Sequence, residues 1–160
     1  MKLSFDEKGY LQPARALNCD LADFEQYFVN NFPNSNTRHK LFVNYMRYIE
    51  HFSKYITRKF THCIDGSFVT LKENPKNIDL VMFIDYQVYE AHENHLDKYW
   101  SFNLENQDLD AYLIKSYPED HPFFEEYLQK CQEWQRLYTN VKRNFEIVPE
   151  SKGFLNIKFE

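Results

Sequence analysis

The sequence predicts an α/β or α+β fold, in which helices pack on a β-sheet. Apolar segments of strand length alternate along the chain with segments of helical periodicity. The 160 residues are enough for one domain with its own core, and no linker or internal repeat divides them. Hydrophobic residues make up 43% of the chain and aromatic residues 18%, which predicts a compact core rich in Phe and Tyr. We therefore treat residues 1–160 as a single domain.

The first part of the chain contains one clear helix after a segment that is difficult to interpret. Residues 1–36 read as an N-terminal extension in which only 21–29 has the spacing of a short helix, and a Pro- and Asn-rich stretch then ends it. Residues 37–56 carry apolar side chains at helical spacing, which predicts a longer helix capped by Asn36 or Thr37. The side chains with this spacing are Leu41, Tyr45, Tyr48, Phe52 and Tyr55.

Strands and helices then alternate to the end of the chain. Residues 59–65 form a short strand-like run that ends before Gly66, and residues 77–85 are apolar at nearly every position. A strand that is buried on both faces has the second pattern, so we expect 77–85 to be central in the sheet. The remaining pattern predicts helices at 89–102 and 121–139, the latter opened by Pro122, and strands at 109–117 and 153–160.

Composition and charge narrow the possible locations and partners. No apolar run approaches the roughly 20 residues that cross a bilayer, and the first residues lack the apolar stretch of a signal peptide, so we expect a cytoplasmic protein with no membrane partner. The net charge of −5 disfavours bulk DNA binding. Residues 38–59 nevertheless hold six Lys and Arg against one Glu. This positive region is either a solvated helix face or a contact surface for phosphates or an acidic partner.

The stretch CIDGSFVTLKENPKNIDLVMFID, which begins at Cys63, has the character of a binding site. Gly66 and Ser67 stand where a strand ends and a short helical turn can begin. Free N–H groups, a serine hydroxyl and a glycine that lets a ligand approach the backbone together favour phosphate binding. A Gly-Ser pair after a strand is also typical of an ordinary turn.

Acidic and amide side chains follow this turn at spacings that suggest a metal site. Asn77 and Asp79 are two residues apart on one predicted strand, so both point to the same side at its start. Asp110 begins a later predicted strand in the same way. Carboxylates on two neighbouring strands beside a phosphate-binding turn are the groups that a magnesium–nucleotide site requires.

These motifs resemble a known superfamily. The segments GSFVTLK and NPKNIDLVMF are similar to the Gly-Ser, spacer, Asp-x-Asp signature of polymerase-beta-like nucleotidyltransferases, and in particular to small bacterial members with a Gly-Ser-Phe-Val-Thr-x-Lys motif. The segment LDAYLIKSYP resembles the strand that carries that group's third acid, and ESKGFLNIKF resembles its closing strand. The resemblance covers roughly residues 40–159.

The resemblance implies a fold, an activity and cofactors. The fold is a mixed β-sheet of about four to five strands with flanking helices. The activity is transfer of a nucleoside monophosphate from a nucleoside triphosphate to a protein or RNA acceptor with two Mg²⁺ ions, as in toxin–antitoxin or phage-defence systems. Gly66 and Ser67 would hold the triphosphate. Lys72 could reach a phosphate, unless it is an ordinary exposed lysine of the loop. Asp79 and Asp110 would be the catalytic metal ligands.

The sequence departs from the superfamily pattern at one catalytic position. The first motif aspartate falls on Asn77, whose neutral oxygen cannot bridge two cations as a carboxylate does. One unit charge at ~4 Å, with an effective dielectric constant near 20, is worth about 4 kcal/mol, or roughly a thousandfold in rate. Asp65 or Asp108 could supply a compensating charge, unless Asp65 only caps the following turn and Asp108 is solvated.

Three functions therefore remain open from the sequence. The protein is an active nucleotidyltransferase, or it is a catalytically impaired member of that fold that binds a nucleotide or a partner protein. The third alternative is an unrelated structural domain in which the motif occurs by chance. Asn77 separates the first two alternatives, because an aspartate there would restore the missing charge.

Overall fold

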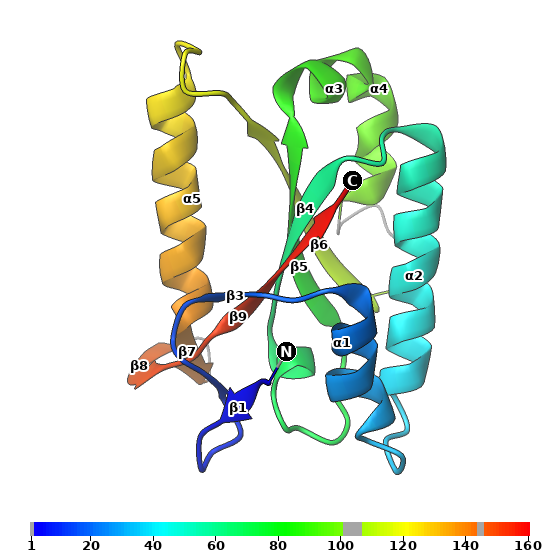
Figure 1. Cartoon of the computed structure of the whole chain (residues 1–160), viewed down its shortest axis with the longest axis vertical. Coiled ribbons are helices and arrows are strands. Elements are labelled where there is room, and N and C mark those ends of the chain that lie inside the picture. Colours follow the sequence, from blue (N-terminus) through cyan, green and yellow to red (C-terminus); the bar gives the residue numbers. More distant parts are fainter. Residues whose placement is uncertain (1, 101–106, 144–145) are drawn as a thin grey trace.

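The computed structural model describes residues 2–100, 107–143 and 146–160, and its centre is a five-stranded sheet (Figure 1). The strand order is β3-β9-β4-β5-β6. The strands are β3 (Ala16–Asn18), β4 (Phe60–Asp65), β5 (Ile78–Asp85), β6 (Leu109–Ser116) and β9 (Phe154–Phe159). β5 pairs in parallel with β6, and β4 pairs antiparallel with both of its neighbours. The predicted class, a mixed sheet of four to five strands with flanking helices, is confirmed.

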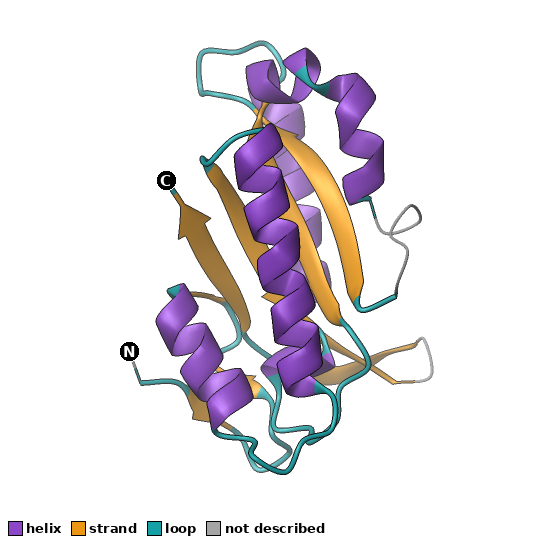
Figure 2. Ribbon diagram, turned by 90° about the vertical axis from the view of Figure 1, so that its right-hand side faces the viewer, coloured by secondary structure: helices purple, strands orange, loops and turns teal. Residues whose placement is uncertain are grey.

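Two long helices cover the two faces of this sheet (Figures 1 and 2). α2 (Arg38–Tyr55) covers one face, and α5 (Phe124–Thr139) covers the other. The side chains of β5 alternate between the two faces. Leu80 and Met82 pack in the larger core cluster on the α2 side, whereas Val81 packs with Tyr138 of α5, so β5 is buried between the two helices. None of the helices in the described residues combines the length and apolar character needed to cross a membrane.

The N-terminal segment is part of the domain and not a separate extension. β1 (Ser4–Phe5) and β2 (Leu11–Gln12) form a small sheet, and β3 extends the main sheet beside β9. α1 (Leu21–Glu25) continues as a π-helix, Gln26–Asn30, whose Phe28 is fully buried in the larger core cluster. Strands of two or three residues are too short to show an alternating pattern, which is why the sequence did not reveal them.

Three further features differ from the expectations. The predicted helix 89–102 is divided into α3 (Tyr86–Ala91), α4 (Glu93–Leu96) and a 3₁₀ turn, and its last two residues lie outside the described part of the chain. Between α5 and β9 lies an unexpected hairpin of β7 (Asn140–Arg143) and β8 (Glu146–Ser151). Thr37 is the N-cap of α2, as expected, but its side chain makes no cap hydrogen bond; the hydroxyl of Ser35 accepts the Arg38 N–H at 3.1 Å instead.

The buried guanidinium of Arg38 joins α2 to the loop after Gly66. Its Nη1 donates to the carbonyl oxygens of Phe28 and Phe68 at 2.8 and 2.7 Å. Its Nη2 donates to Thr70 and Lys72 at 2.8 and 2.5 Å, and its Nε also donates to Lys72 at 3.2 Å. Every N–H of the side chain thus has a carbonyl partner. Arg38 is 1% exposed, so it is not part of a positive surface.

Arg38→Lys should lower the free energy of unfolding by about 2–4 kcal/mol. A lysine has only three N–H donors on a narrower head group, so it leaves some of the buried carbonyls without a partner. Chemical denaturation of both proteins measures the difference. Arg47→Lys is the matched control because Arg47 is exposed on the same helix, and an equal, small effect of both substitutions would contradict the structural role of Arg38.

Candidate functional site

Three aspartates form a row across three neighbouring strands. The strand register pairs Asp65 of β4 with Asp79 of β5, and pairs Asp79 with Asp110 of β6. Residues directly opposite one another on paired strands have side chains on the same face. The three carboxylates therefore lie side by side, and all three line one cavity of about 890 Å³.

The cavity lies at the end of the sheet, on the face that α5 covers. Its wall combines segments that are far apart in the sequence: the turn at 7–10, the loop at 65–72, the end of α5, the start of β7 and Lys152. Tyr112 and Trp134 line it beside Asp110, and their ring centroids are 5.2 Å apart. One side of the cavity is thus acidic and another is aromatic.

Five of the residues selected from the sequence line this cavity, and one does not. The five are Gly66, Ser67, Lys72, Asp79 and Asp110. Asn77 lies in the turn before β5 and is not among the lining residues. Asp108 faces α2 instead, where it accepts a hydrogen bond from Asn44 at 2.6 Å and lies 3.5 Å from the Lys40 ammonium. Asp108 therefore supplies no compensating charge to the cavity, whereas Asp65 lies within it.

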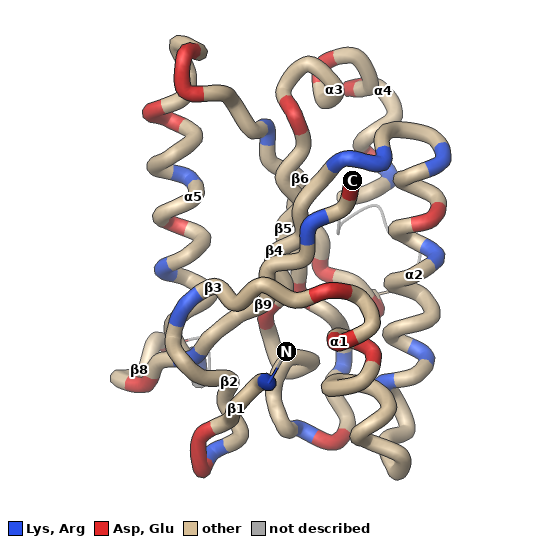
Figure 3. The backbone as a smooth tube through the Cα atoms, viewed as in Figure 1, with Lys and Arg blue, Asp and Glu red and all other residues tan. Residues whose placement is uncertain are grey.

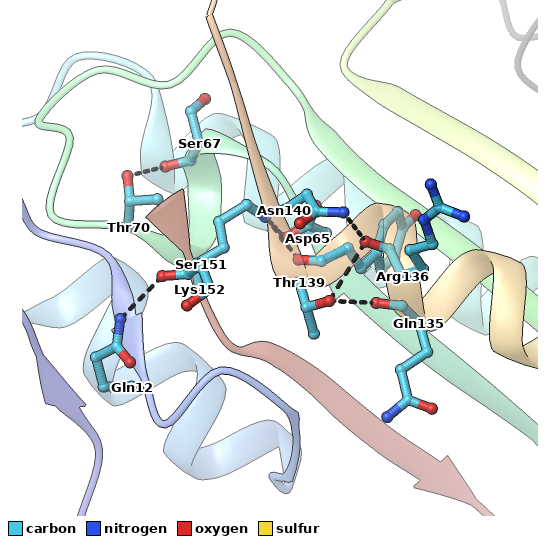
Figure 4. Close-up of polar contacts among 11 residues, drawn as sticks. Gln12, Asp65, Ser67, Thr70, Gln135, Arg136, Thr139, Asn140, Ser151 and Lys152 are labelled. Carbon is cyan, nitrogen blue, oxygen red and sulfur yellow. Dashed lines mark hydrogen bonds and ion pairs between the residues drawn. The ribbon is translucent and has the colours of Figure 1, made fainter. Parts of the chain in front are cut away.

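Gly66 makes room for Asp79. Its φ of +79° is in the region that side chains disfavour, and a Cβ at this position would lie 2.0 Å from the Asp79 Oδ2. The 3₁₀ turn Ser67–Val69 follows at once, and the Thr70 hydroxyl donates to the Ser67 carbonyl at 2.8 Å (Figure 4). The glycine is thus required by the neighbouring carboxylate, a reason that the sequence motif alone did not give.

A buried ion pair forms part of the cavity wall. The Lys152 ammonium contacts the Asp65 carboxylate and also donates to the Tyr138 carbonyl at 3.0 Å (Figure 4). Both charged residues are less than a tenth exposed. Sequence reasoning missed this role of Lys152, although the residue lies in the segment that resembles the closing strand. The only local sequence feature that could have pointed to Lys152 was its position directly before Gly153.

The crowded carboxylates change the protonation of Asp79. Burial, followed by the nearby charges of Asp65 and Asp110, raises the pKa of the Asp79 carboxyl to about 7, and Lys152 and Lys142 offset only part of this effect. At neutral pH the cavity thus holds a carboxyl group that is close to its titration midpoint. A cation placed against it would favour the ionised form.

The acidic side of the cavity fits one divalent cation shared with a ligand. Within residues 2–100, 107–143 and 146–160, no group of three or more His, Cys, Asp and Glu side chains is arranged to hold a metal ion. Asp65 is engaged by Lys152, which leaves Asp79 and Asp110. Mg²⁺ is commonly bound by one or two carboxylates, with phosphate oxygens and water as its other ligands. These two side chains fit that arrangement, and a cation there would relieve the repulsion around Asp79.

The fold and the site define an α+β protein with a cavity that is lined by aspartates at one end of a mixed sheet. Residues 3–158 match the family DUF6932, which is described as a family of unknown function, and the chain belongs to this family. No curated protein and no solved structure gives a significant match. The match begins before β1, so the N-terminal strands lie within the matched region.

Gly66→Ala should lower the free energy of unfolding by about 2 kcal/mol or more, because the new methyl group adds backbone strain and displaces the Asp79 carboxylate. Denaturation of a double-mutant cycle with Asp79→Ala tests the cause. In the Asp79→Ala background the cost of Gly66→Ala should fall, since the clashing atoms are gone. Equal costs in both backgrounds would show that the close contact does not matter.

Asp79→Asn should stabilise the protein above pH 7. Because the folded state binds the Asp79 proton more tightly than the unfolded state, the stability from this group falls as pH rises from about 4 to about 7. The variant should therefore exceed the wild type by up to about 4 kcal/mol at pH 8, and the difference should vanish towards pH 4. Urea denaturation at several pH values measures this, with Asp120→Asn in an exposed loop as the control. A variant less stable than wild type at pH 8 would contradict the prediction.

Proposed function

We propose that the protein binds a magnesium–nucleoside triphosphate in this cavity and transfers a nucleoside monophosphate from it to a protein or RNA acceptor. One observation carries the proposal: Asp79 and Asp110 are adjacent on paired strands, within the same cavity as Gly66 and Ser67. These four residues lie in segments that carry the superfamily resemblance. Their convergence is what a metal–nucleotide site requires.

Different residues of the cavity would bind the metal ion, the phosphates and the base of the nucleotide. Asp79 and Asp110 would hold Mg²⁺, which when bound supplies positive charge to the phosphate oxygens. Ser67 would donate its hydroxyl to a phosphate, and Lys72 at the edge of the cavity would add a positive charge. The flat ring of Trp134, in the aromatic wall, would stack on the base.

The transfer is a displacement at the α-phosphorus. The acceptor oxygen forms a bond to this phosphorus, and the bond from the α-phosphorus to the bridging β-phosphate oxygen breaks. Pyrophosphate leaves with the electron pair of that bond, and the proton of the acceptor passes to water. The carboxylates hold the reacting groups in line, since phosphoryl-type transfers depend mainly on positioning and electrostatic stabilisation.

A second function, nucleotide binding with little or no transfer, is favoured by two observations. Asn77 is not among the residues that line the cavity, and Asp65 is occupied by Lys152, so neither provides a third carboxylate for metals. In this alternative the nucleotide-bound protein acts by binding a partner. The phosphate-binding residues are the same, so only transfer separates the two functions.

We propose a cytoplasmic location and a protein or RNA partner, as in a toxin–antitoxin or defence pair. The surface that we assign to this partner is made up of three exposed residues of α2, Lys40, Arg47 and Lys54. Figure 3 shows Lys and Arg positions distributed along this helix. Acidic groups are the complement of such a surface. Arg38, which belonged to the positive region in the sequence, is excluded from it by its burial.

Asn77→Asp should raise Mg²⁺-dependent label transfer by no more than roughly tenfold, because residue 77 lies outside the cavity lining and its charge acts from a longer distance through water. The assay incubates each of the four α-labelled triphosphates with an RNA and a protein fraction, and with the protein itself, as acceptors. Asn34→Asp, in an exposed turn, is the matched control. Asp110→Asn should abolish the signal.

A thermal-shift measurement with Mg²⁺ and each triphosphate separates the outcomes. A ligand at 100 times its dissociation constant stabilises the folded state by about 2.7 kcal/mol. A shift without label in either protein supports the binding function and contradicts transfer. No shift and no label in either protein would overturn both functions.

A further inference from the structure

Lys152 is a buried ammonium that the fold fixes from several directions. Its backbone N–H donates to the Thr139 carbonyl at 2.9 Å, at the end of α5. The N–H of the next residue, Gly153, donates to the Leu11 carbonyl at 2.6 Å. A Cβ at Gly153 would lie 2.6 Å from the Pro13 carbonyl oxygen, so only glycine fits at this position without a clash. The side chain of Lys152 therefore starts from a rigid position.

The ammonium still has one donor for a ligand. A lysine carries three N–H groups, and Asp65 and the Tyr138 carbonyl account for two of them among the described residues. Lys152 also lines the cavity, beside Asp79 and Asp110. The third N–H can thus donate to a phosphate oxygen bound there, as a charge-assisted hydrogen bond.

The pairing of Asp65 favours one divalent cation over two. Lys152 occupies Asp65, which leaves Asp79 and Asp110 as the two aspartates of the row that can bind a cation. A second ion would need a bridging carboxylate, and Asp65, the third carboxylate, is paired with Lys152. Asn77, at the superfamily's first aspartate position, does not line the cavity. The ion pair therefore removes one metal ligand and supplies one fixed positive charge.

We propose that Lys152 takes the place of a second metal ion: it contacts the triphosphate directly and, by holding Asp65, limits the cavity to one divalent cation. This inference rests on the proposed function, since it assigns the binding of the same triphosphate. It differs from the two Mg²⁺ ions that the superfamily resemblance implies. Lys152 is thereby a phosphate-binding residue, and Asp65 is the residue that positions it.

The test counts bound Mn²⁺ by electron paramagnetic resonance in the presence of inorganic tripolyphosphate, which needs no assumption about the base. The wild type should bind one ion per chain. Lys152→Met frees Asp65 and should raise the count to two. In the single variant Lys152→Met, the buried Asp65 has no partner, which destabilises the fold. The double variant Asp65→Asn with Lys152→Met removes both charges and avoids this cost. This double variant should keep one ion and bind tripolyphosphate roughly tenfold more weakly in calorimetry.

Lys130→Met, at an exposed position of α5 outside the cavity lining, is the control and should bind as the wild type does. Two ions in the wild type, one ion in Lys152→Met, or unchanged tripolyphosphate affinity in the double variant would overturn this inference while the proposed function stands. If the wild type binds neither Mn²⁺ nor tripolyphosphate, the proposed function fails, and the inference fails with it.

Discussion

Repulsion among three carboxylates on adjacent strands is the constraint on which the rest of the site depends. Strand pairing places Asp65, Asp79 and Asp110 in one row, and like charges at such positions are unfavourable. The protein responds in three ways. Lys152 pairs with the first carboxylate, a glycine at position 66 leaves room for the second, and the pKa of Asp79 rises. Clusters of buried carboxylates with perturbed pKa values are typical of functional sites, which supports the cation site proposed above.

The neighbouring loop is held by a different means, because its partners are backbone carbonyls and not carboxylates. Arg38 is 3.8 Å from the centroid of the Phe32 ring and directs its donors at the loop that carries Ser67 and Lys72. Burial lowers the pKa of its guanidinium to about 10, so it stays charged at neutral pH. Two buried cations thus have different roles: Arg38 holds the carbonyls of the loop, and Lys152 lines the cavity beside Asp65.

The sequence predicted the elements whose pattern is long and local. α2, α5, β4, β5, β6 and β9 were recognised because periodicity over several residues reports which face is buried. β1, β2 and β3 have two or three residues each, and β8 of the hairpin has no buried residue, so tertiary pairing sets these strands. In the site, the motif located Gly66, Ser67, Asp79 and Asp110. The Lys152–Asp65 pair escaped notice because residues 87 positions apart share no local signal.

That same separation orders the events of folding. Closing a loop of 87 residues costs more chain entropy than forming the local contacts within helices and hairpins, so the pair forms late. Until then the aspartates remain hydrated and repel one another only weakly through water. The edge of the main sheet depends on the same C-terminal segment, because Asn18 of β3 and Asn156 of β9 are 138 positions apart, so the cavity wall and the sheet edge are completed together.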